Sequence, residues 1–102
     1  MIELTDKNFH ENTRNGIVLV DFWAPWCSSC LKLMPILEEI EKEHKKIKFM
    51  KLNSSDHMET ARKFNVMSLP TAVILKDGNE IGRINGYLPK ENFVGQITSI
   101  VK

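Results

Sequence analysis

The hydrophobic positions along the chain switch between strand-like and helix-like spacing from end to end. Segment 17–23 is β-branched and almost continuously apolar, which is typical of a strand covered on both faces in the middle of a sheet. In the next segment Leu33, Leu37 and Ile40 recur at helical spacing, opposite a face rich in Glu and Lys. No internal repeat or linker interrupts the alternation, so we expect a single α/β domain over residues 1–102.

Shorter patterns predict the remaining elements. Asp56 and Glu59 resemble a capping box that opens a helix ending near Phe64. Asp77-Gly78 predicts a hairpin turn, which makes the last two strands antiparallel neighbours. Strands are predicted at 2–4, 47–53, 71–75 and 80–84, a short first helix is capped by Thr5, and a final helix has Pro89 at its first position. The expected order is therefore βαβαβαββα.

Composition narrows the classes of function. The chain has 102 residues, of which 42% are hydrophobic, and this fits one apolar core. A net charge of +1 gives no basic field for a phosphate backbone, so we expect no nucleic-acid partner. The longest apolar run is far shorter than the roughly 20 residues that cross a bilayer. The first residues lack the pattern of a secretory signal, and we expect a cytoplasmic monomer with no membrane association.

The two cysteines lie close together, in the segment Cys27-Ser28-Ser29-Cys30. Positions i and i+3 on the opening turn of a helix are neighbours, so the pair can form a small, reversible disulfide. The unpaired N–H groups and the positive end of the helix dipole favour a thiolate at Cys27, and such motifs lower a cysteine pKa to about 3.5–7.5. We therefore expect Cys27 to attack and Cys30, deeper in the helix, to resolve the mixed disulfide.

Asp21 is a carboxylate inside the most apolar strand of the chain. Burial there would raise its pKa and let it hold and pass a proton near neutrality. The alternative is that Asp21 lies at the rim of the sheet with a hydrogen-bond partner. Lys51, on the next predicted strand, is either the charge partner of Asp21 or an ordinary solvated lysine.

These residues together resemble the thioredoxin family. The resemblance rests on Asp21-Phe22-Trp23-Ala24-Pro25-Trp26-Cys27, Cys30, Pro35, Ser68-Leu69-Pro70-Thr71, Lys76-Asp77-Gly78 and Gly86, and it runs nearly the length of the chain. It implies the thioredoxin fold, a central mixed β-sheet flanked by helices on both faces.

The resemblance also implies a role for each matching position. Cys27 matches the attacking cysteine, Cys30 the resolving one, Asp21 the buried acid and Lys51 the lysine beside it. Pro70 matches a cis-proline that lies against the disulfide and leaves the backbone of the preceding residue free for an extended substrate. The implied apolar docking surface consists of Trp26, Leu69, Gly86 and Tyr87.

Two positions depart from the family pattern. Ser28-Ser29 replaces the usual Gly-Pro, and the two hydroxyls can donate to the Cys27 thiolate. A stabilised thiolate makes the disulfide a better oxidant, so we predict a potential above the ~−270 mV of thioredoxin, toward about −200 to −230 mV. Leu31 stands where the family often has Lys, so less positive charge flanks the site.

We therefore expect a thiol–disulfide oxidoreductase that reduces protein disulfides. The resemblance implies recycling by a separate reductase of the thioredoxin-reductase type; the chain itself has no Gly-x-Gly-x-x-Gly and needs no cofactor. An oxidase or isomerase is the rival within the enzyme class, and a binding module with idle cysteines is a second alternative. A metal shared between two subunits is the third, although the histidines show no paired ligand spacing and we expect no metal. Met34, Met50, Met58 and Met67 are expected to fill gaps in the core or at its edge.

Overall fold

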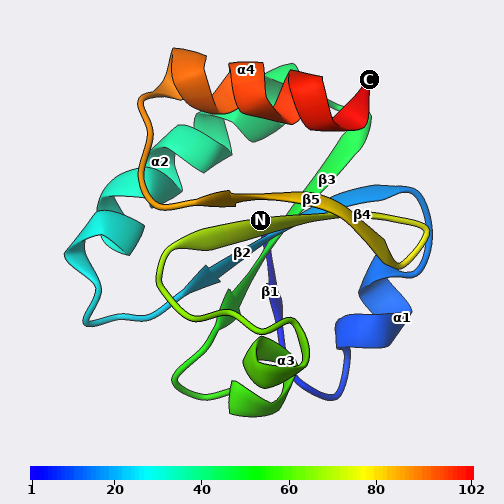
Figure 1. The fold of residues 1–102 in the computed structure, drawn as a ribbon, viewed down its shortest axis with the longest axis vertical. Coiled ribbons are helices and arrows are strands. Elements are labelled where there is room, and N and C mark those ends of the chain that lie inside the picture. The colour runs from blue at the N-terminus through cyan, green and yellow to red at the C-terminus, as the bar shows by residue number, and fades with distance from the viewer.

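A five-stranded sheet in the order β1-β3-β2-β4-β5 forms the centre of the molecule (Figure 1). The computed structural model describes residues 1–102. β1 and β2 run parallel to β3, whereas β4 is antiparallel to both β2 and β5, so the sheet is mixed as expected. The strands are β1 (Ile2–Leu4), β2 (Ile17–Trp23), β3 (Ile47–Asn53), β4 (Thr71–Lys76) and β5 (Asn79–Asn85).

Four helices cover the two faces of this sheet: α1 (Phe9–Thr13), α2 (Ser28–Glu43), α3 (Met58–Lys63) and α4 (Lys90–Val101). α2 and α4 pack on one face, and α1 and α3 lie on the other (Figure 1). The element order and the thioredoxin fold are thus confirmed. None of the helices is long and apolar enough to cross a membrane.

The central strand β2 is apolar because it supplies both cores. Leu19 packs in the cluster under α2 and α4, while its neighbours Val18 and Val20 pack in the cluster on the opposite face. All three side chains are fully buried. Because successive strand residues point to opposite faces, Asp21 shares the face of Leu19 and lies on the side covered by α2.

The predicted capping box of α3 is wrong. His57 is the N-cap and makes no side-chain cap. Asp6, which follows β1, instead accepts hydrogen bonds from the backbone N–H (2.9 Å) and the hydroxyl (2.6 Å) of Thr60. A long-range contact therefore replaces the local motif, because the loop after β1 brings a carboxylate to the first turn of α3.

Two other helix starts differ from the predictions. Thr5 does not cap α1 itself; its hydroxyl accepts from the backbone N–H of Asn8 at 3.1 Å, in the turn before the helix. Pro89 is the N-cap of α4 and not its first residue. Its extended backbone (ψ 157°) leads the chain into the helix, which begins at Lys90, one residue later than predicted.

Candidate active site

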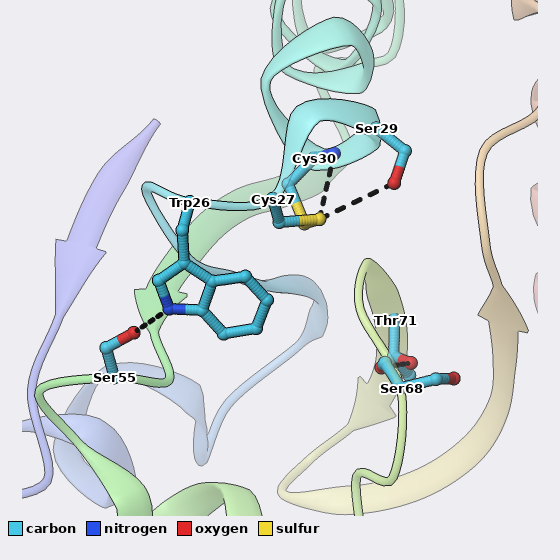
Figure 2. The surroundings of a disulfide bond; sticks show 7 residues. All are labelled: Trp26, Cys27, Ser29, Cys30, Ser55, Ser68 and Thr71. Carbon is cyan, nitrogen blue, oxygen red and sulfur yellow. Dashed lines mark hydrogen bonds between the residues drawn. A yellow bond between two sulfur atoms is a disulfide. The ribbon is translucent and has the colours of Figure 1, made fainter.

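The two cysteines form a disulfide at the start of α2 (Figure 2). Cys27 is the N-cap, and its Sγ accepts a hydrogen bond from the backbone N–H of Cys30 at 3.3 Å. The hydroxyl of Ser29 lies 3.5 Å from the same sulfur. Cys27 keeps 8% of its surface exposed whereas Cys30 has none, so an incoming group meets Cys27 first. The helix start also favours negative charge on that sulfur.

Asp21 is buried with no solvent exposure, and neither of its carboxylate oxygens has a hydrogen-bond partner. Burial raises the pKa of Asp21 to about 7; the nearby Lys51 lowers it and the carboxylate of Glu3 raises it. The same face of the sheet is covered by α2, whose buried side includes Cys30. A carboxyl with this pKa exchanges a proton at neutral pH, beneath the helix that carries Cys30.

Lys51 is the register partner of Asp21 on the adjacent strand, but its ion pair is with another residue. Its Nζ lies 3.7 Å from Oε1 of Glu3, 3.5 Å from the sulfur of Met34 and 5.5 Å from the centre of the Trp23 ring. The indole Nε1 of Trp23 donates to Oε2 of Glu3 at 3.3 Å. Glu3 therefore contacts both the lysine and the indole, close enough for its charge to act on the buried Asp21.

Sequence reasoning missed Glu3. The residue belongs to a three-residue strand, which is too short for a hydrophobic pattern to show its function. The position of Glu3 next to Lys51 follows from the parallel register of β1 against β3, in which the two residues lie directly opposite each other. This register became visible only once the strand order was known.

The loop before β4 lies beside the disulfide. The Leu69–Pro70 peptide bond is cis, as the resemblance implied. Gly86, which has a positive φ of 87°, donates its backbone N–H to the carbonyl of Pro70 at 2.8 Å, and Thr71 donates its hydroxyl to the carbonyl of Ser68 at 2.7 Å. Leu69 makes no backbone–backbone hydrogen bond, so its polar groups are free for another chain.

A groove of about 350 Å³ opens between this loop, the disulfide and α3. Its side chains include Trp26, Cys27, Met58, Arg62, Met67 and Leu69. Trp26 is 75% exposed, Met67 86% and Met58 50%, which is unusual for large apolar side chains. The indole Nε1 of Trp26 donates to Ser55 Oγ at 3.0 Å, which fixes one wall of the groove (Figure 2).

The structure places some of the predicted docking residues at the groove and the others away from it. Trp26 and Leu69 line the groove with Cys27. Pro70 is buried, and Gly86 donates a hydrogen bond to its carbonyl. Neither residue lines the groove. Tyr87 packs against the core under α2 and α4, and Lys32 Nζ lies 4.7 Å above its ring, so it does not line the groove either.

The methionine prediction holds for Met50, which is buried, and is wrong for Met58 and Met67. These two side chains are exposed at the groove, where no core surrounds them. Met58 and Arg62 are one helical turn apart on α3. This spacing was the sequence pattern that places the two side chains on one face of the helix. The spacing could not indicate a binding surface from sequence, because nothing in the sequence showed that α3 faces the disulfide.

Comparison with known proteins decides the family. The sequence model of the thioredoxin family, described as "Thioredoxin", matches residues 1–99. The chain belongs to the thioredoxin family. It is 43% identical to a thioredoxin of Staphylococcus haemolyticus over 93 residues, which is 90% of this chain and 89% of that protein.

Two further thioredoxins agree with this assignment. Identity is 44% over 92 residues with the thioredoxin of Bacillus subtilis, covering 89% of this chain and 88% of the relative. It is 46% over 90 residues with that of Listeria monocytogenes, covering 87% of each. As a family member with a Cys27–Cys30 disulfide, the protein is a thiol–disulfide oxidoreductase that reduces disulfides, and neither the oxidase nor the metal-binding alternative is favoured.

Proposed function

We propose that Cys27 is the attacking cysteine of this oxidoreductase and Cys30 the resolving one. In the reduced protein the Cys27 thiolate attacks one sulfur of a protein disulfide, forms a mixed disulfide and expels the other substrate sulfur as a thiolate. Cys30 then loses its proton and attacks the sulfur of Cys27. The second substrate thiolate leaves, and the electron pair of the dithiol has moved to the substrate. The greater exposure of Cys27 supports this order.

Asp21 takes the proton of Cys30 in this proposal, directly or through water. Its pKa of about 7 lets it accept a proton when the mixed disulfide forms and release it afterwards. Lys51 tunes this acid from the neighbouring strand. The substrate lies as an extended segment along Leu69, with Pro70 and Gly86 shaping the loop and Trp26 forming the opposite wall. Tyr87, which packs against the core under α2 and α4, lies outside this groove.

The oxidised protein is recycled, we propose, by an enzyme of the thioredoxin-reductase type. The thioredoxins to which the chain is similar are bacterial proteins, and we place this one in the cytoplasm as a monomer. Ser29 beside the Cys27 sulfur supports a potential above ~−270 mV, because a hydroxyl that donates to the thiolate stabilises the reduced form. Equilibration with glutathione measures this potential directly, and a value of −270 mV or lower contradicts it.

The observation that carries the proposal is the asymmetry of exposure between the two cysteines, and trapping tests it. Cys30→Ser leaves Cys27 able to attack but removes the resolving thiol, so a covalent complex with an oxidised protein such as insulin accumulates. Reducing agent releases it. Cys27→Ser is the matched control and forms no such complex. Trapping by Cys27→Ser in place of Cys30→Ser would reverse the assignment.

A further inference from the structure

The groove beside the disulfide contains a single charged side chain. Seven of the ten residues that line it are hydrophobic, and the others are Ser54, Ser68 and Arg62. No carboxylate takes part in the lining. The surface that receives a substrate therefore combines an apolar floor with one fixed positive charge.

The walls of this groove differ in rigidity. Trp26 is held by its hydrogen bond to Ser55, and α3 is held by Asp6 through Thr60. Met58 and Met67 are long, unbranched side chains that adapt to different partners. Three of the six large hydrophobic side chains exposed on the whole molecule, those of Trp26, Met58 and Met67, line this groove. Such a concentration marks an interaction surface.

Arg62 is free to bind a partner. It is exposed on α3, and none of the ion pairs of the protein includes it. Arg83 offers a contrast within the same chain, because Glu80 and the carbonyl of Phe64 occupy its guanidinium at 2.6–2.8 Å. A guanidinium without an internal partner, at the rim of an apolar groove, has the geometry that binds a carboxylate with two parallel hydrogen bonds.

We propose that Arg62 makes this oxidoreductase selective for extended protein segments that carry an Asp or Glu side chain near the reactive disulfide. The apolar residues of the segment lie against Trp26 and the two methionines, and its carboxylate pairs with Arg62. The inference rests on the proposed function, since it takes Cys27 as the atom that meets the substrate.

The size of the effect follows from the exposure of the arginine. Exposed ion pairs contribute about 0.2–1 kcal/mol, which corresponds to a preference of about 1.4- to fivefold in kcat/KM. Salt weakens such a pair over a Debye length of about 8 Å at physiological ionic strength. The preference therefore decreases as salt is added, while the apolar contribution of the groove does not.

Matched peptides test the proposal. Each peptide contains one internal disulfide and one Glu or Gln, placed in turn at each of several positions on either side of the reactive cysteine. The rate of reduction is followed by the tryptophan fluorescence of the protein. Wild type is compared with Arg62→Gln and Arg62→Glu. The control is Lys63→Gln, which makes the same change of charge on α3 but on the side that faces Asp6 and His10.

The expected result is a preference for Glu over Gln at one or two adjacent positions. It is lost in Arg62→Gln, reversed in Arg62→Glu and kept in Lys63→Gln. Equal rates for all peptides with the wild type overturn the inference, and so does an equal loss in Lys63→Gln, which would reveal a long-range charge effect. In both cases the peptides are still reduced. A wild-type protein that reduces none of them contradicts the proposed function instead.

Discussion

The two sulfurs of the disulfide have opposite surroundings. Cys30 has no solvent exposure and lies on the buried side of α2, toward the sheet face that carries Asp21, Lys51 and Glu3. Cys27 opens onto a groove made of exposed apolar side chains and one arginine. One sulfur therefore lies toward a buried acid and the charged residues that flank it, and the other faces a surface that a second protein can cover.

Because of this difference in surroundings, the two sulfurs respond to different kinds of interaction. A charge in the interior acts through a low effective dielectric, so a single carboxyl changes a pKa or the stability strongly. A charge on the surface is screened and contributes little, so selectivity there depends on several weak contacts. Substitution of the buried acid itself should consequently have larger effects than substitutions around the groove.

The largest expected effect is on folding stability in Asp21→Asn. The folded protein has its Asp21 pKa near 7 and the unfolded chain near 3.8, so the folded state keeps a proton that the unfolded state releases between these pH values. The wild type therefore loses stability as pH rises from about 4 to 7, by about 4 kcal/mol in total, and no more above that. Asparagine does not ionise.

Urea unfolding of the oxidised proteins from about pH 4 to pH 8 measures this difference. The free energy of unfolding of Asp21→Asn relative to the wild type should rise across the range and level off above the pKa of the acid. Parallel pH profiles for the two proteins would show that Asp21 is not desolvated in the way its position indicates.

The second effect is on the resolving step, again in Asp21→Asn. A positioned general base contributes about 100-fold or more to a proton transfer, so release of the substrate from the mixed disulfide should slow by about that factor at neutral pH. The first attack, by Cys27, should change far less. Single-turnover kinetics with a fluorescent substrate separate the two steps, and equal slowing of both would remove Asp21 from its proposed role.

Much of this site follows from sequence because its signals are local. The spacing of Cys27 and Cys30, the apolar run around Asp21 and the turn at Asp77-Gly78 each depend on neighbouring residues. β2 and β3 have the bounds that their patterns predict, and both residues of that turn have positive φ angles (51° and 86°). Local patterning fixes such elements before any tertiary contact is known.

The features that sequence missed depend on contacts between distant segments. Asp6 caps α3 across more than 50 residues of chain, and Glu3 meets Lys51 only through the register of β1 against β3. Arg62 and the exposed methionines acquire meaning only when α3 is placed beside the disulfide. No periodicity encodes these juxtapositions, since each depends on the path of the whole chain.

The third prediction concerns Ser29→Ala, next to the sulfur of Cys27. Its hydroxyl lies 3.5 Å from the Cys27 sulfur, and losing one hydrogen bond to the charged thiolate costs about 1.5–3 kcal/mol. The reduced form is then less stable, so the potential should become more negative by about 30–65 mV. Equilibration with glutathione measures it. Ser28→Ala is the control, because Ser28 is exposed and makes no hydrogen bond to the sulfur; an equal change in that variant would point to the helix backbone as the cause.

The smallest effect is expected for Glu3→Gln, because the Glu3 side chain is exposed and acts on Asp21 through its charge alone. Glutamine has the same shape and can still accept a hydrogen bond from the indole of Trp23. Because it is uncharged, it cannot form the ion pair with Lys51. The carboxylate of Glu3 raises the pKa of Asp21 and the lysine lowers it. Removing the carboxylate should therefore lower that pKa by a fraction of a unit, whereas Lys51→Met should raise it.

Carbon-13 NMR of the Asp21 carboxyl in the oxidised protein follows this titration directly, independently of turnover. Glu38→Gln is the matched control, since Glu38 is exposed on α2 and forms no ion pair, and it should leave the Asp21 titration unchanged. A titration that is equally displaced in both variants would mean that Asp21 responds only to the net charge of the protein. A titration displaced in Glu3→Gln alone makes Glu3 a positioning residue, because its charge reaches the cysteines only through Lys51 and the buried acid.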